Sequence, residues 1–137
     1  MTKLILNDLQ IFSLKDGDLL HCLKKSDSGY KNFGEVYFSE IKKNHIKAWK
    51  RHKQMTLNLV VPVGKIKFNF IEFTSNNTIS RNEIILSKDN YKRITVPPGI
   101  VFGFKGISEN NILANITDII HDDLEVESID ISKYEFI

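Results

Sequence analysis

Cysteine is almost absent from this chain of 137 residues. The single cysteine, Cys22, excludes an internal disulfide framework and a zinc site built from several cysteines, and it favours a reducing compartment. No stretch approaches the roughly 20 consecutive apolar residues of a membrane-spanning helix. Residues 1–12 also lack the apolar core and cleavage site of a secretory signal. We therefore expect a cytoplasmic protein with no membrane partner.

A large excess of charge is also missing. The 19 basic and 17 acidic side chains leave a net charge of +2, whereas a nucleic-acid-binding domain needs a clearly basic face. We therefore expect no nucleic-acid partner. With 42% hydrophobic and 26% charged residues, the composition is typical of one globular domain, which we assign to residues 1–137.

Helical periodicity is the third absence, because no long window has apolar residues at positions i, i+3, i+4 and i+7. Short runs rich in β-branched and aromatic residues recur instead, bounded by turn residues. Along residues 65–70, polar and apolar residues alternate and place Ile66, Phe68 and Phe70 on one face. The pattern predicts an all-β domain of about nine to eleven strands, closed as a sandwich or barrel. Gly64 and the Pro97-Pro98-Gly99 sequence predict tight turns.

Charge is unevenly distributed along the chain. Residues 42–53 contain six Lys or Arg and no acid, and residues 118–135 contain seven acids and one Lys. The basic run is consistent with a phosphate or diphosphate site and equally with a solvated edge strand. The acidic segment has no metal-ligand spacing such as that of an EF-hand loop, so we interpret it as solvated surface.

Histidine is the side chain best suited to proton transfer at neutral pH. His21 has no catalytic residue type nearby, and His121 adjoins two aspartates that are typical of a polar turn. His45 and His52 are seven residues apart, so only one of them can face the interior of a barrel. The chain has no nucleophile elbow and no glycine-rich phosphate loop, which disfavours acyl-transfer, kinase and dehydrogenase chemistry.

Four motifs occur in a characteristic order: the basic residues 49–54, a valine-rich run ending at Gly64, residues 96–104, and residues 112–118. This order resembles the cupin jelly roll, and within it the family of dTDP-4-dehydrorhamnose 3,5-epimerases and related nucleotide-sugar isomerases. The family's motifs are Arg-Gly-Leu-His-Phe-Gln, a valine-rich strand ending in Gly, Ile-Pro-x-Gly-x-Ala-His-Gly-Phe, and a segment ending in Thr-Asp. The resemblance covers roughly residues 33–120.

The resemblance implies a jelly roll acting on a dTDP-4-keto-6-deoxyhexose in surface polysaccharide biosynthesis, and a homodimer that exchanges strands. In that family the matching histidine takes a proton from the carbon beside a ketone. This assigns the base to His52, anion contacts to Lys50 and Arg51, and a positioning role to Gln54. Trp49 is assigned to the substrate site, where it could stack on a base or sugar, or it could lie at a dimer interface. Strand alternation places Lys50, but not Arg51, on the face of His52.

Several positions depart from the family pattern, and each departure bears on the chemistry. The family's arginine, lysine, second histidine and tyrosine positions hold Trp49, Thr56, Phe102 and Ala114. In that family the tyrosine delivers a proton from the face opposite the base. Its loss here leaves open a ketoisomerase with a proton shuttle on one face, an epimerase with Tyr37 or Tyr91 as the acid, or a non-catalytic sugar- or nucleotide-binding cupin.

The shortage of histidine favours a site without a metal, and we expect no cofactor. Metallocupins use several His and a Glu from two motifs, and this chain retains one His in the first motif and Phe102 in the second. Phe68, Phe70, Phe102 and Phe104 are spaced at the strand period, so we expect them to fill the barrel.

Overall fold

The computed structural model describes residues 2–137 and confirms an all-β jelly roll. Two of its strands are only two residues long, and a single 3-10 turn, η1, lies near the C-terminus. None of the helical structure in residues 2–137 has the length and apolar character to cross a membrane. The elements are β1 (Ile5–Asp8), β2 (Ile11–Phe12), β3 (Leu19–Leu20), β4 (Glu35–Glu40), β5 (Ile46–His52), β6 (Leu57–Val63), β7 (Ile66–Phe73), β8 (Ile79–Leu86), β9 (Lys92–Val96), β10 (Val101–Gly106), β11 (Ile112–Thr117), β12 (Val126–Ser128) and η1 (Ile131–Lys133).

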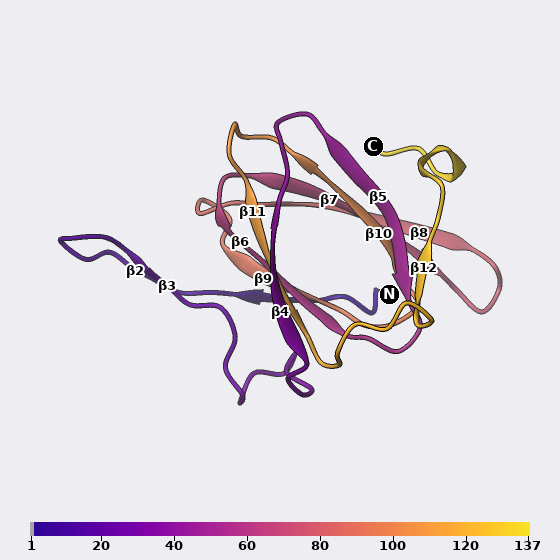
Figure 1. The fold of residues 1–137 in the computed structure, drawn as a ribbon, viewed down its shortest axis with the longest axis horizontal. Coiled ribbons are helices and arrows are strands. Elements are labelled where there is room, and N and C mark those ends of the chain that lie inside the picture. The colour runs from indigo at the N-terminus through magenta and orange to yellow at the C-terminus, as the bar shows by residue number, and fades with distance from the viewer. Residues whose placement is uncertain (1) are drawn as a thin grey trace.

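Two antiparallel five-stranded sheets form the barrel, in the orders β1-β9-β6-β11-β4 and β12-β5-β10-β7-β8. They face each other around a shared interior, and the short β2-β3 hairpin projects away from the barrel (Figure 1). The C-terminal segment returns alongside β5, so β12 pairs with β5 at the edge of the second sheet. This arrangement brings the acidic C-terminal segment next to the basic strand.

Aromatic side chains fill the centre of the barrel, as their spacing predicted. Ile66, Phe68 and Phe70 are each 0% exposed, and the rings of Phe68 and Phe70 stack with centroids 5.9 Å apart. Phe102 is buried in the same cluster, and Phe104 packs against it. Alternation along β7 therefore puts its apolar face into the core.

Both predicted turns are present. Gly64 joins β6 to β7 with a φ of +82°, and a Cβ there would lie 2.1 Å from the carbonyl oxygen of Asn110. A side chain at this position would therefore be excluded by space as well as by conformation. Gly99 has a φ of +91° in the turn before β10.

The basic segment forms an internal strand, which corrects the edge-strand alternative. β5 pairs with β10 on one side and with β12 on the other. Its lysines therefore do not protect a free sheet edge.

Trp49, which the sequence assigned to the substrate site, is buried beneath the C-terminal segment and does not line the barrel interior. Its side chain is 1% exposed and packs with Tyr134 and Phe136 of the C-terminal segment rather than with the barrel interior. The indole Nε1 donates a hydrogen bond to the carbonyl oxygen of Tyr134 at 3.2 Å. The C-terminal segment therefore covers the Trp49 side of β5.

Candidate active site

A cavity of about 400 Å³ lies between the two sheets. A larger hollow of about 660 Å³ lies among residues 40–47 and 109–112, where the lysine and histidine side chains are exposed. The smaller cavity is the candidate site because it contains a histidine with a buried carboxylate partner. Its polar wall is formed by Tyr37 and Ser39 of β4, Lys47, Lys50 and His52 of β5, Asn115 and Thr117 of β11, and His121.

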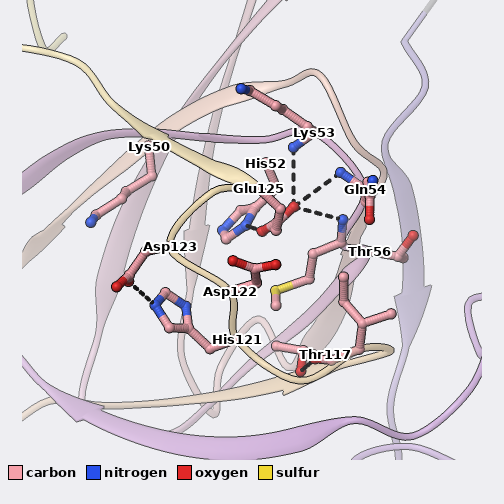
Figure 2. A network of polar contacts seen from close by, with 12 residues as sticks. Lys50, His52, Lys53, Gln54, Thr56, Thr117, His121, Asp122, Asp123 and Glu125 are labelled. Atoms are coloured by element: carbon pink, nitrogen blue, oxygen red, sulfur yellow. Dashed lines mark hydrogen bonds and ion pairs between the residues drawn. The ribbon is translucent and has the colours of Figure 1, made fainter.

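His52 is the last residue of β5. Glu125 immediately precedes β12, the strand that pairs with β5 (Figure 2). The Nδ1 atom of His52 forms a hydrogen bond with Oε1 of Glu125. The two side chains are 13% and 5% exposed. Because Glu125 engages Nδ1, the ring nitrogen left to exchange a proton with a ligand is Nε2.

Backbone N–H groups hold the second carboxylate oxygen of Glu125, Oε2. Oε2 accepts hydrogen bonds from the backbone N–H groups of Lys53, Gln54 and Met55 at 3.2, 3.0 and 3.1 Å (Figure 2). Burial raises the pKa of Glu125, but the hydrogen bonds from His52, Gln54 and Met55 outweigh burial and leave that pKa below its ordinary value. Glu125 is therefore a fixed negative charge beside the imidazole at neutral pH.

Phe102 fixes the plane of the His52 ring. The two rings stack with centroids 6.2 Å apart and an interplanar angle of 21°. Phe102 stacks in turn on Phe70 at 6.3 Å, which connects the site to the core. The residue at the family's second histidine position is thus an apolar support for His52. Among residues 2–137, no three metal-ligating side chains come together.

The remaining predicted site residues divide between the two faces of β5. Lys50 lines the cavity with His52, and its Nζ donates a hydrogen bond to Oγ of Ser128 at 3.1 Å. Arg51, the other predicted anion contact, lies on the opposite face, where it pairs with Glu127 at 2.9 Å and does not line the cavity. Gln54 lies beyond the strand with an exposed side chain, and its backbone N–H rather than its amide contacts the site.

Glu125 is the functional residue that the sequence did not indicate, and the expectation of a purely solvated acidic segment was wrong for it. It lies 73 residues from His52, and no local spacing links the two. His121 also lines the cavity, with its Nε2 atom 2.7 Å from Oδ1 of Asp123 (Figure 2). The two histidines belong to the same cavity although they are far apart in the sequence.

The family's tyrosine position does not line the cavity in this chain. Ala114 packs on the outer face of the sheet with Val60 and Tyr91, whereas its neighbour Asn115 faces inward. Tyr37, on the strand beside Asn115, also lines the cavity.

The chain is similar in fold to enzymes of known structure. A dTDP sugar isomerase from Desulfovibrio desulfuricans shares 32% sequence identity and matches with a TM-score of 0.89 over 93% of this chain and 84% of that chain. The chain belongs to the cupin family of nucleotide-sugar epimerases and isomerases. The resemblance that the motif order suggested is therefore confirmed. No protein-family model and no curated protein matched the sequence.

Two further members of this fold group show how its activities vary. A dTDP-4-dehydrorhamnose 3,5-epimerase from Sulfolobus tokodaii is 21% identical, with a TM-score of 0.84 over 97% of this chain and 80% of that chain. A 3,4-ketoisomerase from Thermoanaerobacterium thermosaccharolyticum, in complex with TDP-4-keto-6-deoxyglucose, is 16% identical, with a TM-score of 0.77 over 93% of this chain and 88% of that chain. At these identities the likeness establishes the shared fold.

The lowered pKa of Glu125 predicts a specific dependence of stability on pH. Its ionised form contributes stability that is complete above the carboxyl pKa of the unfolded chain, about 4.3, and is lost as pH falls through the lower folded-state value. We expect Glu125→Gln to be less stable than the native chain near neutral pH by about 1–3 kcal/mol. The reason is that some of the buried donors that bond to the Glu125 carboxylate would lose their acceptor. We also expect a smaller loss of stability in acid than the native chain shows.

Urea denaturation across the acidic range measures both effects. Glu109→Gln is the matched control, because that side chain is 79% exposed. An identical pH dependence in the native chain and Glu125→Gln would contradict the assignment.

Proposed function

We propose that this protein is an isomerase-class enzyme that epimerises or isomerises a dTDP-4-keto-6-deoxyhexose by metal-free proton abstraction next to the ketone. The observation that carries the proposal is the buried His52–Glu125 pair facing a cavity, in a chain 32% identical to a dTDP sugar isomerase. The reaction would serve surface polysaccharide synthesis in the cytoplasm, the compartment that the single Cys22 favours.

His52 has the surroundings that a base needs. Its Nε2 atom would take the proton from the carbon next to the ketone while the C–H electron pair moves to form an enolate. Glu125 would stabilise the imidazolium that results, as the carboxylate does in a His–Asp pair. Lys50, on the same wall, would stabilise the negative charge on the enolate oxygen.

The second proton step decides the product. Tyr37 belongs to β4, in the sheet opposite that of His52, so its hydroxyl would reach a ligand from the other side. Tyr91 is unsuited to this role because its hydroxyl donates to the carbonyl oxygen of His21 at 2.6 Å, away from the cavity. Delivery by Tyr37 would invert the carbon, whereas return of the proton by His52 to the neighbouring carbon would move the ketone.

The diphosphate is the expected partner of the basic strand. Lys47 and Lys50 both line the cavity, and Lys53 follows directly after the end of β5. Clustered ammonium groups at a cavity rim bind phosphate oxygens through charge-assisted hydrogen bonds. A non-catalytic sugar- or nucleotide-binding cupin would use the same contacts, and the measurement of proton exchange distinguishes the two.

Exchange of substrate hydrogen with solvent tests the base. With dTDP-4-keto-6-deoxyglucose in heavy water, we expect the native protein to incorporate deuterium next to the ketone and His52→Ala to lower that rate by about a hundredfold to ten-thousandfold. Mass spectrometry and NMR of the recovered sugar measure the incorporation. Binding without incorporation, across a panel of keto-sugar nucleotides, would identify a binding protein instead of an enzyme.

Tyr37→Phe separates abstraction from delivery. If Tyr37 supplies the second proton, this variant will still exchange deuterium but will form inverted product at least about tenfold more slowly. Tyr91→Phe is the control because its hydroxyl is bonded outside the cavity. Equal product formation by native and Tyr37→Phe protein would leave the one-face ketoisomerase mechanism.

We also propose that the protein is a homodimer. An apolar groove of about 480 Å³ lies on the outer face of the sheet that ends in β4, and Phe33 and Phe38 on its rim are 63% and 73% exposed. A second copy would cover these side chains and the free edge of β4.

Light scattering should give twice the chain mass for the native protein, and Phe38→Glu should reduce the measured mass to that of one chain. Ile79→Glu, on the edge strand of the other sheet, should leave it unchanged.

A further inference from the structure

One buried oxygen in the cavity has no partner. Asn115 lines the cavity from β11, and its amide oxygen Oδ1 is buried but accepts no hydrogen bond from the described residues 2–137. The Nε atom of Arg81 is another buried polar atom without a partner in this range, but its guanidinium lies near the C-terminal segment, where Nη2 donates to the backbone carbonyl oxygen of Glu135. Buried polar atoms in folded proteins are rarely left unpaired, so the Asn115 oxygen calls for a ligand.

Other buried amides in the same protein are paired. Oδ1 of Asn58 accepts from Arg93 at 3.2 Å and from Thr95 at 2.6 Å. Oδ1 of Asn111 accepts from the backbone N–H of Lys65 at 2.9 Å. These two amides hold the fold together, whereas the amide in the cavity leaves its oxygen free.

The position of Asn115 places it across the cavity from the base. Its strand belongs to the sheet opposite that of β5, and Asn115 is the direct register partner of Tyr37. Side chains of directly paired strand residues lie next to each other on one face. A ligand between the sheets would therefore meet His52 on one side, and the tyrosine and amide side chains on the other.

The chemistry of an acceptor limits what it can recognise. An amide oxygen needs a donor, and neither a phosphate oxygen of the ionised diphosphate nor a ketone oxygen has a hydrogen to donate. A sugar hydroxyl has one. Since the cavity beside His52 is where the reacting sugar must lie, the free acceptor is matched to a hydroxyl of that sugar.

We propose that Asn115 is a specificity-determining residue whose Oδ1 atom accepts a hydrogen bond from a ring hydroxyl of the keto-sugar. The inference rests on the proposed function of the cavity as a sugar site. It assigns to β11 a role in selecting the sugar, separate from the proton transfer assigned to β5. A sugar that lacks this hydroxyl leaves the oxygen unpaired and binds more weakly.

Asn115→Leu tests the proposal because it removes the acceptor at similar volume. Binding is measured by calorimetry in a His52→Ala background, so that the sugar is not converted. We expect the Kd for dTDP-4-keto-6-deoxyglucose to rise about tenfold and the Kd for TDP alone to stay unchanged. The melting temperature should stay the same or rise, because an unpaired buried oxygen is lost. The matched variant Asn111→Leu should lower it, because that amide is paired.

Analogues that lack the C2 or the C3 hydroxyl identify the group recognised. One of them should bind the Asn115 protein about tenfold more weakly than the parent sugar, and the leucine variant should bind that analogue and the parent equally. Equal loss of TDP and keto-sugar binding, unchanged keto-sugar binding, or a lower melting temperature would each overturn the proposal.

The proposed catalysis can fail independently of this contact. Absence of deuterium incorporation by the native protein, together with the expected differences in binding, would leave Asn115 as a sugar contact in a binding protein.

Discussion

The buried carboxylate of Glu125 is the constraint on which the rest of the site depends. A carboxylate removed from water is unfavourable unless it is fully paired, and here an imidazole and three backbone N–H groups supply the pairing. Those donors belong to the end of β5 and the residues after it, whereas Glu125 belongs to the C-terminal segment. The orientation of His52 is therefore determined by how the end of the chain packs.

Both faces of β5 contribute to this arrangement. Its cavity face carries Lys50 and His52, and its outer face carries Trp49 and Arg51, which hold the C-terminal segment by packing and by an ion pair with Glu127. The pairing of β12 with β5 lies between these contacts and Glu125. Trp49 thus anchors the segment that supplies Glu125, through its packing on Tyr134 and Phe136 and its hydrogen bond to the carbonyl oxygen of Tyr134.

The parts of the fold and site that were predictable are those encoded by neighbouring residues. Strand alternation identified the buried face that includes Phe68, and a positive φ was expected at Gly64. Alternation also placed Lys50 beside His52. The partners of Trp49 and His52 come from residues more than 70 positions away, and only sheet pairing brings them together. The unpaired oxygen of Asn115 is likewise a property of the folded cavity that no sequence pattern carries.

The two walls of the cavity divide the chemical work between charged and neutral groups. β5 presents an imidazole backed by a carboxylate and a nearby ammonium group, which can move a proton and stabilise an enolate. The facing strands β4 and β11 present a phenol and an amide, which have no charge at neutral pH. An amide can orient a hydroxyl but cannot transfer a proton, so of these two groups only the phenol of Tyr37 suits the proposed role of second proton donor. Under the proposed mechanism, the product is an epimer if the phenol of Tyr37 reaches the enolate face turned away from His52 while Asn115, on the same wall as Tyr37, holds the sugar hydroxyl, and a shifted ketone if it does not.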